Sequence, residues 1–252
     1  MKKVLYPFLL LFLWVFAGCS DTSDDDNSNF TANRQQVGSS ARDLLTQENF
    51  DRLILDIVYV EGYRPSDTTI DNLISFINNR THKPAGIEIE FTAVGSTGLE
   101  EFEIQEIANI EVRERTFYNQ GTTMAVYIYF ADAPSENSSD NTLILGSAYF
   151  NTSIVIYEES VRKLADRRAG LSYNTVATAV LEHEFAHLLG LVDLGTPLQS
   201  DHLDVENGNH CNVTDCLMNA NIEFGTPDVL GDDEIPELDP ACLEDLRANG
   251  GK

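Results

Sequence analysis

The segment YNTVATAVLEHEFAHLLG, residues 173–190, constrains the fold of this chain more than any other stretch. Its apolar residues recur at helical spacing and Gly190 stands where a helix would end, so the segment predicts a single helix. Residues four apart lie on the same face of a helix, one turn from each other. His183 and His187 can therefore bind one metal ion through their imidazole nitrogens.

Glu184 completes a His-Glu-x-x-His motif on this helix. Its side chain points about 100° around the helix axis from His183, which places the carboxylate beside metal-bound solvent and not on the metal. Zinc lowers the pKa of a bound water to about 7, so Glu184 can take its proton and later protonate a leaving amine. Accidental spacing is a poor explanation, because five histidines in 252 residues produce this motif by chance only roughly once in a hundred chains.

Upstream of this helix, strand-like and helix-like segments alternate. Strands are predicted at 52–62, 86–95 and 123–132, and helices at 66–80 and 101–117. Such alternation predicts an α/β (α+β) fold with a twisted, mostly parallel sheet and crossover helices. Two further β-like runs, 143–150 and 152–159, are separated only by Asn151 and predict an antiparallel pair at the edge of the sheet. An extended peptide can pair with such an edge strand.

The part of the chain after the helix is rich in Gly, Pro, Asn and Asp and predicts a small, irregular C-terminal lobe. Asp239 and Pro240 are typical of the start of a closing helix. The length suits one globular domain, 38–252, with an upper lobe over about 38–190 and a lower lobe over about 191–252.

The first twenty residues, MKKVLYPFLLLFLWVFAGCS, have the layout of a secretory signal, which we assign to 1–18. The apolar run is shorter than the roughly 20 residues that span a bilayer. The stretch FAGC resembles the bacterial lipobox, and this resemblance implies that Cys19 carries a lipid anchor. We therefore expect a protein of the bacterial cell envelope, attached to the membrane through Cys19.

Residues 19–37 are polar and acidic, which predicts a disordered tether. Their acidic start resembles the export tag of surface-exposed lipoproteins in Bacteroidetes-like bacteria, and a plain solvated spacer is the alternative. The whole chain carries a net charge of −25, which argues against nucleic acid or an anionic bilayer surface as a partner. We expect a monomer.

Cys211, Cys216 and Cys242 can form at most one disulfide among themselves in an oxidising compartment. Cys211–Cys216 closes a short loop and is the first expectation, and Cys216–Cys242 is the second. A cysteine metal cluster would need a fourth ligand, which the sequence does not obviously supply.

The stretch HEFAHLLGLVD resembles the HExxHxxGxxH/D signature of the metzincin zinc peptidases. The resemblance implies one catalytic zinc ion, a sharp turn at Gly190 that returns a third ligand to it, and a later turn that places a methionine under the site. CLMN, 216–219, resembles that turn, and the resemblance implies that Met218 is the methionine under the site.

The third ligand is open between three residues. Asp193 stands at the ligand position of the signature, as in the snapalysin-like branch. HCNVTDCLM, 210–218, resembles the archaemetzincin stretch His-Cys-x4-Cys-x-Met. This resemblance implies that His210 is the third ligand and that residues 194–209 are an insertion. His202 is the third candidate. The later Cys-x-x-Cys of archaemetzincins is missing, so we expect no second zinc site.

Together these features predict a lipid-anchored, zinc-dependent endopeptidase that binds a protein or peptide along the strand at 143–150 and uses Glu184 as general base. One alternative is a non-catalytic, zinc-stabilised surface lipoprotein that binds peptides without cutting them. A closed shell of four protein ligands would favour this alternative, because it leaves no open position for water. Another alternative is a zinc hydrolase that acts on a non-peptide bond.

Overall fold

The computed structural model of the chain describes residues 29–139, 142–167, 170–225 and 234–252. The predicted signal segment 1–18, Cys19 and the first part of the tether lie outside the described residues. Among the residues that are described, no helix is both long and apolar enough to cross a membrane.

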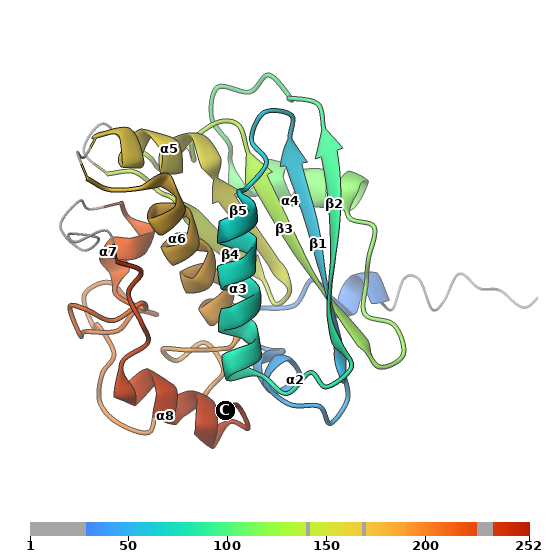
Figure 1. Cartoon of the computed structure of the whole chain (residues 1–252), viewed down its shortest axis with the longest axis vertical. Coiled ribbons are helices and arrows are strands. Elements are labelled where there is room, and N and C mark those ends of the chain that lie inside the picture. The colour runs from blue at the N-terminus through green and yellow to red at the C-terminus, as the bar shows by residue number, and fades with distance from the viewer. Residues whose placement is uncertain (1–28, 140–141, 168–169, 226–233) are drawn as a thin grey trace, which may run out of the picture.

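A five-stranded sheet in the order β2-β1-β3-β5-β4 forms the centre of the molecule (Figure 1). Neighbouring strands are parallel except for β4, which pairs antiparallel with β5 and forms one edge. The strands are β1 Arg52–Val60, β2 Gly86–Val94, β3 Thr123–Ala131, β4 Gly146–Phe150 and β5 Ser153–Tyr157. The mostly parallel sheet with an antiparallel edge strand is therefore confirmed.

Helices cover both faces of the sheet (Figure 1). One face packs with α3 Asp67–Arg80, α5 Glu158–Arg167 and α6 Tyr173–Leu188, and the other with α4 Ile104–Glu114. Eight of the nine residues of β3, the central strand, are buried, as expected for a parallel strand covered on both sides. Because of this packing, α6 lies between α3 and β4, the strand at the edge of the sheet.

Local signals in the sequence set several helix ends. The Ser66 hydroxyl accepts a hydrogen bond from the backbone N–H of Thr69 at 3.0 Å and caps α3. Asp239 caps α8, Pro240–Ala248, in the same way, through the N–H of Cys242. The helices α2 Ala41–Leu45, α5 and α7 Ala220–Glu223 were not predicted from the sequence. The chain passes from β5 directly into α5, so the predicted strand 152–159 runs two residues too far.

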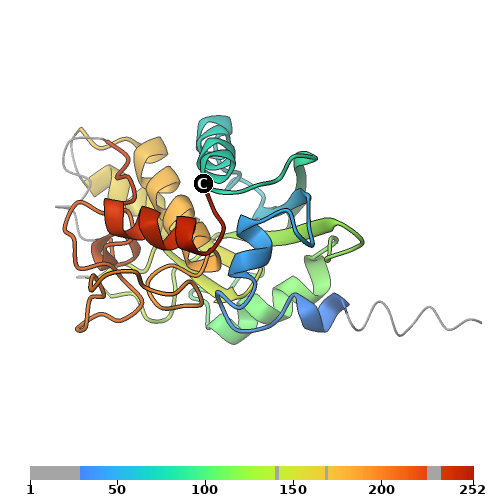
Figure 2. The same ribbon diagram turned by 90° about the horizontal axis from the view of Figure 1, so that it is seen from below.

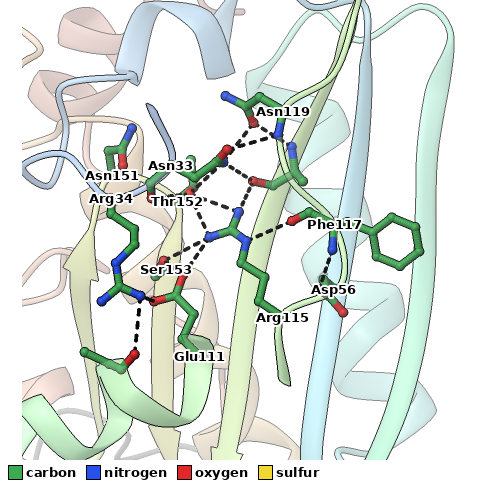
Figure 3. Close-up of polar contacts among 12 residues, drawn as sticks. Asn33, Arg34, Asp56, Glu111, Arg115, Phe117, Asn119, Asn151, Thr152 and Ser153 are labelled. Carbon is green, nitrogen blue, oxygen red and sulfur yellow. Dashed lines mark hydrogen bonds and ion pairs between the residues drawn. The ribbon is translucent and has the colours of Figure 1, made fainter. Parts of the chain in front are cut away.

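A buried polar network fixes the first described segment to the sheet (Figure 3). The side-chain amide of Asn33 donates to the carbonyl of Ala125 and to the Thr152 hydroxyl. The guanidinium of Arg115 bonds the Glu111 carboxylate at 2.7 Å and the Ala125 carbonyl at 2.9 Å. Residues 29–37, which the sequence assigns to the tether, thus lie against the folded domain in the structure.

The C-terminal lobe is irregular apart from α7 and α8, as predicted. Seen from below, α8 lies beside α2 (Figure 2). The last residues return to the upper lobe, because the backbone N–H of Lys252 donates to the carbonyl of Arg80 at the end of α3. This hydrogen bond ties the C-terminus to the end of α3.

Candidate metal centre

The helix α6 carries the motif and is buried from Thr175 to its end. The Ser172 hydroxyl caps its start by accepting from the N–H of Thr175 at 3.1 Å. Gly190 follows the helix with φ +77°, and a Cβ there would meet Ala41 Cβ and the Thr196 nitrogen at 2.7 Å. Only glycine fits this turn, which sends the chain away from the helix axis.

The two histidines of the motif meet through their Nε2 atoms, which lie 3.1 Å apart. His183 Nδ1 lies 2.7 Å from the carbonyl oxygen of Leu217, so Nδ1 carries the proton and Nε2 has a free lone pair. Burial and the neighbouring His210 lower the pKa of His183 to about 4. Burial likewise lowers the pKa of His187 well below its ordinary value. Both imidazoles are therefore neutral at pH 7, the form that binds a metal.

Of the three candidates for the third ligand, the structure places His210 at this site. Its ring centroid lies 5.3 Å from that of His183 and 5.3 Å from that of His187. Its Nδ1 lies 2.7 Å from the carbonyl oxygen of Gly208, so Nε2 is the ring nitrogen that can bind a metal.

The structure does not bring Asp193, another candidate for the third ligand, into this group. Asp193 is exposed, has φ +72° and does not belong to the group of residues around the motif histidines. The chain turns back at Gly190 and passes through an irregular loop before it reaches His210. His202 is buried, but its Nε2 lies 3.2 Å from the carboxylate of Asp245, away from the motif.

The side chain of Glu184 extends from α6 to the edge strand β4. The backbone N–H of Ala148 in β4 donates to its Oε2 at 2.8 Å. Burial and the charge of Glu223 raise the pKa of Glu184 well above its ordinary value. A Cβ at Gly146 would lie 2.8 Å from Glu184 Cγ, so this glycine permits the close approach of strand and helix.

Glu223, the last residue of α7, is a member of the site that sequence reasoning missed. Its Oε2 lies 2.9 Å from His210 Nε2. One donor atom from each of His183, His187, His210 and Glu223 lies within 4.8 Å of all the others. The only signal in the sequence is that Glu223 follows the CLMN turn at short range.

These four residues suit zinc, which binds imidazole nitrogen and carboxylate oxygen in a tetrahedral shell. Zinc–nitrogen bonds of that kind separate neighbouring ligand atoms by roughly 3.3 Å. The observed Nε2–Nε2 and Nε2–Oε2 separations of 3.1 Å and 2.9 Å are close to this value. A cavity of ≈220 Å³ adjoins the group and is lined by Val37, Ser147, Ala148, Glu184, His187, Leu194, Asn209, His210 and Glu223.

Met218 is fully buried in the turn that follows Cys216. Its carbonyl accepts a hydrogen bond from the N–H of Cys211 at 2.7 Å, which ties this turn to the segment that carries His210. The preceding Leu217 provides the carbonyl that orients His183. The turn thus supports two of the three histidines.

The cysteines correct the expectation of a disulfide. Cys211, Cys216 and Cys242 form no disulfide with one another in the structure. They gather with Asp239 so that one donor atom from each lies within 4.8 Å of the others. The Cys211 and Cys242 thiols hydrogen bond to Cys216 and lower its pKa to about 3. Asp239 supplies a fourth donor group, so these residues offer a second place for a metal ion.

The structure resembles archaemetzincin from Methanopyrus kandleri, with a TM-score of 0.51 and 15% identity over 79% of this chain and 96% of that one. This likeness shows a shared fold. Two weaker likenesses are to a zinc-dependent peptidase from Methanocorpusculum labreanum (TM-score 0.47, 12% identity, 76% of this chain and 99% of that one) and metalloproteinase-II from Bacteroides fragilis (0.42, 13%, 81% and 55%). The sequence matches no protein-family model and no curated protein.

Proposed function

We propose that this protein is a zinc-dependent endopeptidase. The observation that carries the proposal is the convergence of the imidazoles of His183, His187 and His210 beside the carboxylate of Glu184. Three protein ligands with an adjacent carboxylate are the arrangement of catalytic zinc sites. The archaemetzincin fold supports the same assignment.

In this mechanism Glu184 is the general base. His183, His187 and His210 would hold zinc, which would polarise the scissile carbonyl and lower the pKa of the attacking water to about 7. The N–H of Ala148 holds Glu184 Oε2 in place, and Oε1 has no partner among the described residues, so it is free to accept the proton. Burial favours the protonated form, which prepares Glu184 to carry the proton to the leaving amine.

The substrate is a protein or peptide that lies extended along β4. This strand ends the sheet, and its Ser147 and Ala148 line the cavity beside the metal ligands. An edge strand offers unpaired backbone groups to an extended chain. We further propose that the protein acts as a monomer at the bacterial cell envelope, anchored by a lipid on Cys19.

Glu184→Gln tests the catalytic role. The full chain and the variant should bind equal amounts of zinc, while cleavage of an unfolded protein substrate falls by about 10²–10⁴-fold in the variant. Glu159→Gln, an exposed site on α5, is the matched control and should retain full activity. Equal cleavage by wild type and Glu184→Gln would refute the mechanism.

The non-catalytic, zinc-stabilised peptide-binding lipoprotein remains a second candidate because of one observation. Glu223 supplies a fourth donor beside the three histidines, and four protein ligands would close the metal to water. Zinc binding with no cleavage by any variant would favour this candidate.

A further inference from the structure

We propose that Glu223 is the fourth protein ligand of the metal in the resting protein, and that an arriving peptide has to displace it before cleavage. This inference rests on the proposed function. It assigns to Glu223 the regulation of the same site.

Glu223 contacts the same ring nitrogen of His210 that a bound metal would take. Its Oε2 lies 2.9 Å from His210 Nε2, the atom that also faces the two motif histidines. His210 Nδ1 already has a partner in the Gly208 carbonyl. A metal bound by the three Nε2 atoms would take His210 Nε2 away from Glu223, and the carboxylate would then lie beside the ion with no other partner among the described residues.

Glu223 also differs from the histidines in its access to solvent. The side chain of His210 is 5% exposed, whereas that of Glu223 is 19% exposed. Glu223 lines the cavity next to Ser147 and Ala148 of the edge strand. A flexible carboxylate at the open side of the site can leave the metal without disturbing the buried imidazoles.

The backbone links Glu223 to the strand that the peptide would use. The carbonyl of Glu223 accepts a hydrogen bond from the N–H of Leu145 at 2.9 Å. Leu145 directly precedes β4, whose Ala148 holds Glu184. A peptide that pairs with β4 therefore contacts the same element that positions Glu223, and its carbonyl oxygen competes for the place of the carboxylate.

The test uses the full chain loaded with zinc or with cobalt(II) and compares wild type, Glu223→Ala and Glu223→Gln, each in the Cys242→Ala background so that the cysteine group binds no metal. Glu206→Ala, an exposed loop residue, is the control. Competition with a chelator should show zinc bound at least about tenfold more weakly by Glu223→Ala. The visible spectrum of the cobalt protein should change with pH near about 7 in both Glu223 variants, where water takes the fourth position, and stay constant in wild type and Glu206→Ala.

Peptide cleavage gives an independent readout. Release of the block should raise kcat/KM several-fold in Glu223→Gln, which keeps the size of the side chain. The proposal is overturned if wild type shows the same pH-dependent cobalt spectrum and the same zinc affinity as the variants. Failure of wild type to bind zinc through its histidines would instead refute the proposed function, so the two failures are distinguishable.

Discussion

Replacement of Gly146 by alanine tests whether the edge strand positions Glu184. The added Cβ would lie 2.8 Å from Glu184 Cγ, 3.0 Å from its Oε1 and 3.0 Å from Val180 Cγ1, where ordinary contacts begin at 3.4 Å. Glu184 Cγ lies close to the backbone of a buried helix, so the strand and helix must separate by about half an ångström. The three histidines lie outside these contacts and should keep the metal.

We expect Gly146→Ala to lower kcat/KM by about tenfold to hundredfold, because small displacements of a reacting group have effects of this size. Overpacking should cost about 1–3 kcal/mol of unfolding free energy. Zinc content should stay at the wild-type value. Gly95→Ala is the control, since a Cβ there meets nothing within 4 Å. Full activity of Gly146→Ala, with zinc bound, would refute the argument that β4 holds Glu184 in position.

Three further predictions concern stability and metal content. Arg115→Met removes the main partner of the Glu111 carboxylate, whose side chain is only 1% exposed. Urea unfolding should show a loss of about 3–5 kcal/mol in the free energy of unfolding, and adding Glu111→Leu should restore part of it. No loss would contradict a buried ion pair. Burial raises the pKa of Glu158 from 4.5 to about 7. The stability that the raised pKa of Glu158 contributes is therefore present below pH 4.5 and lost as the pH rises through 7. In urea titrations, the free energy of unfolding of Glu158→Gln should gain up to about 3 kcal/mol relative to wild type between pH 4.5 and 8. A constant difference between the two proteins would show that the pKa is not raised. Metal analysis should find two zinc ions per chain and one in Cys242→Ala, and a single ion in wild type would exclude Asp239 and the cysteines as a metal site.

Much of the upper lobe could be predicted because its signals are local. Apolar periodicity indicates α3 and α6, and Ser66 marks the start of α3. The boundary between β5 and α5 was missed because no turn residue separates Tyr157 from Glu158, so the strand pattern runs directly into the helix. The small helices α2 and α7 are too short for a periodic signal.

The residues of the site also differ in whether a local signal in the sequence could identify them. His183, Glu184 and His187 could be identified because a single helix fixes their relative positions. His210 reaches them only through an irregular loop, whose path no periodicity encodes, and Glu223 is a single acidic residue among many. Asp239 was recognised only as a helix cap. It does cap α8 through Oδ1, while its Oδ2 lies 3.0 Å from Cys211 Sγ.

The most direct test of the central claim is a zinc titration of His210→Ala and Asp193→Ala against wild type. The claim is that His183, His187 and His210 form the metal centre, with Asp193 outside it. We predict that His210→Ala binds zinc at the motif at least about a hundredfold more weakly, and that Asp193→Ala binds it as wild type does. Undiminished binding by His210→Ala, with binding lost in Asp193→Ala, would contradict the geometry described here.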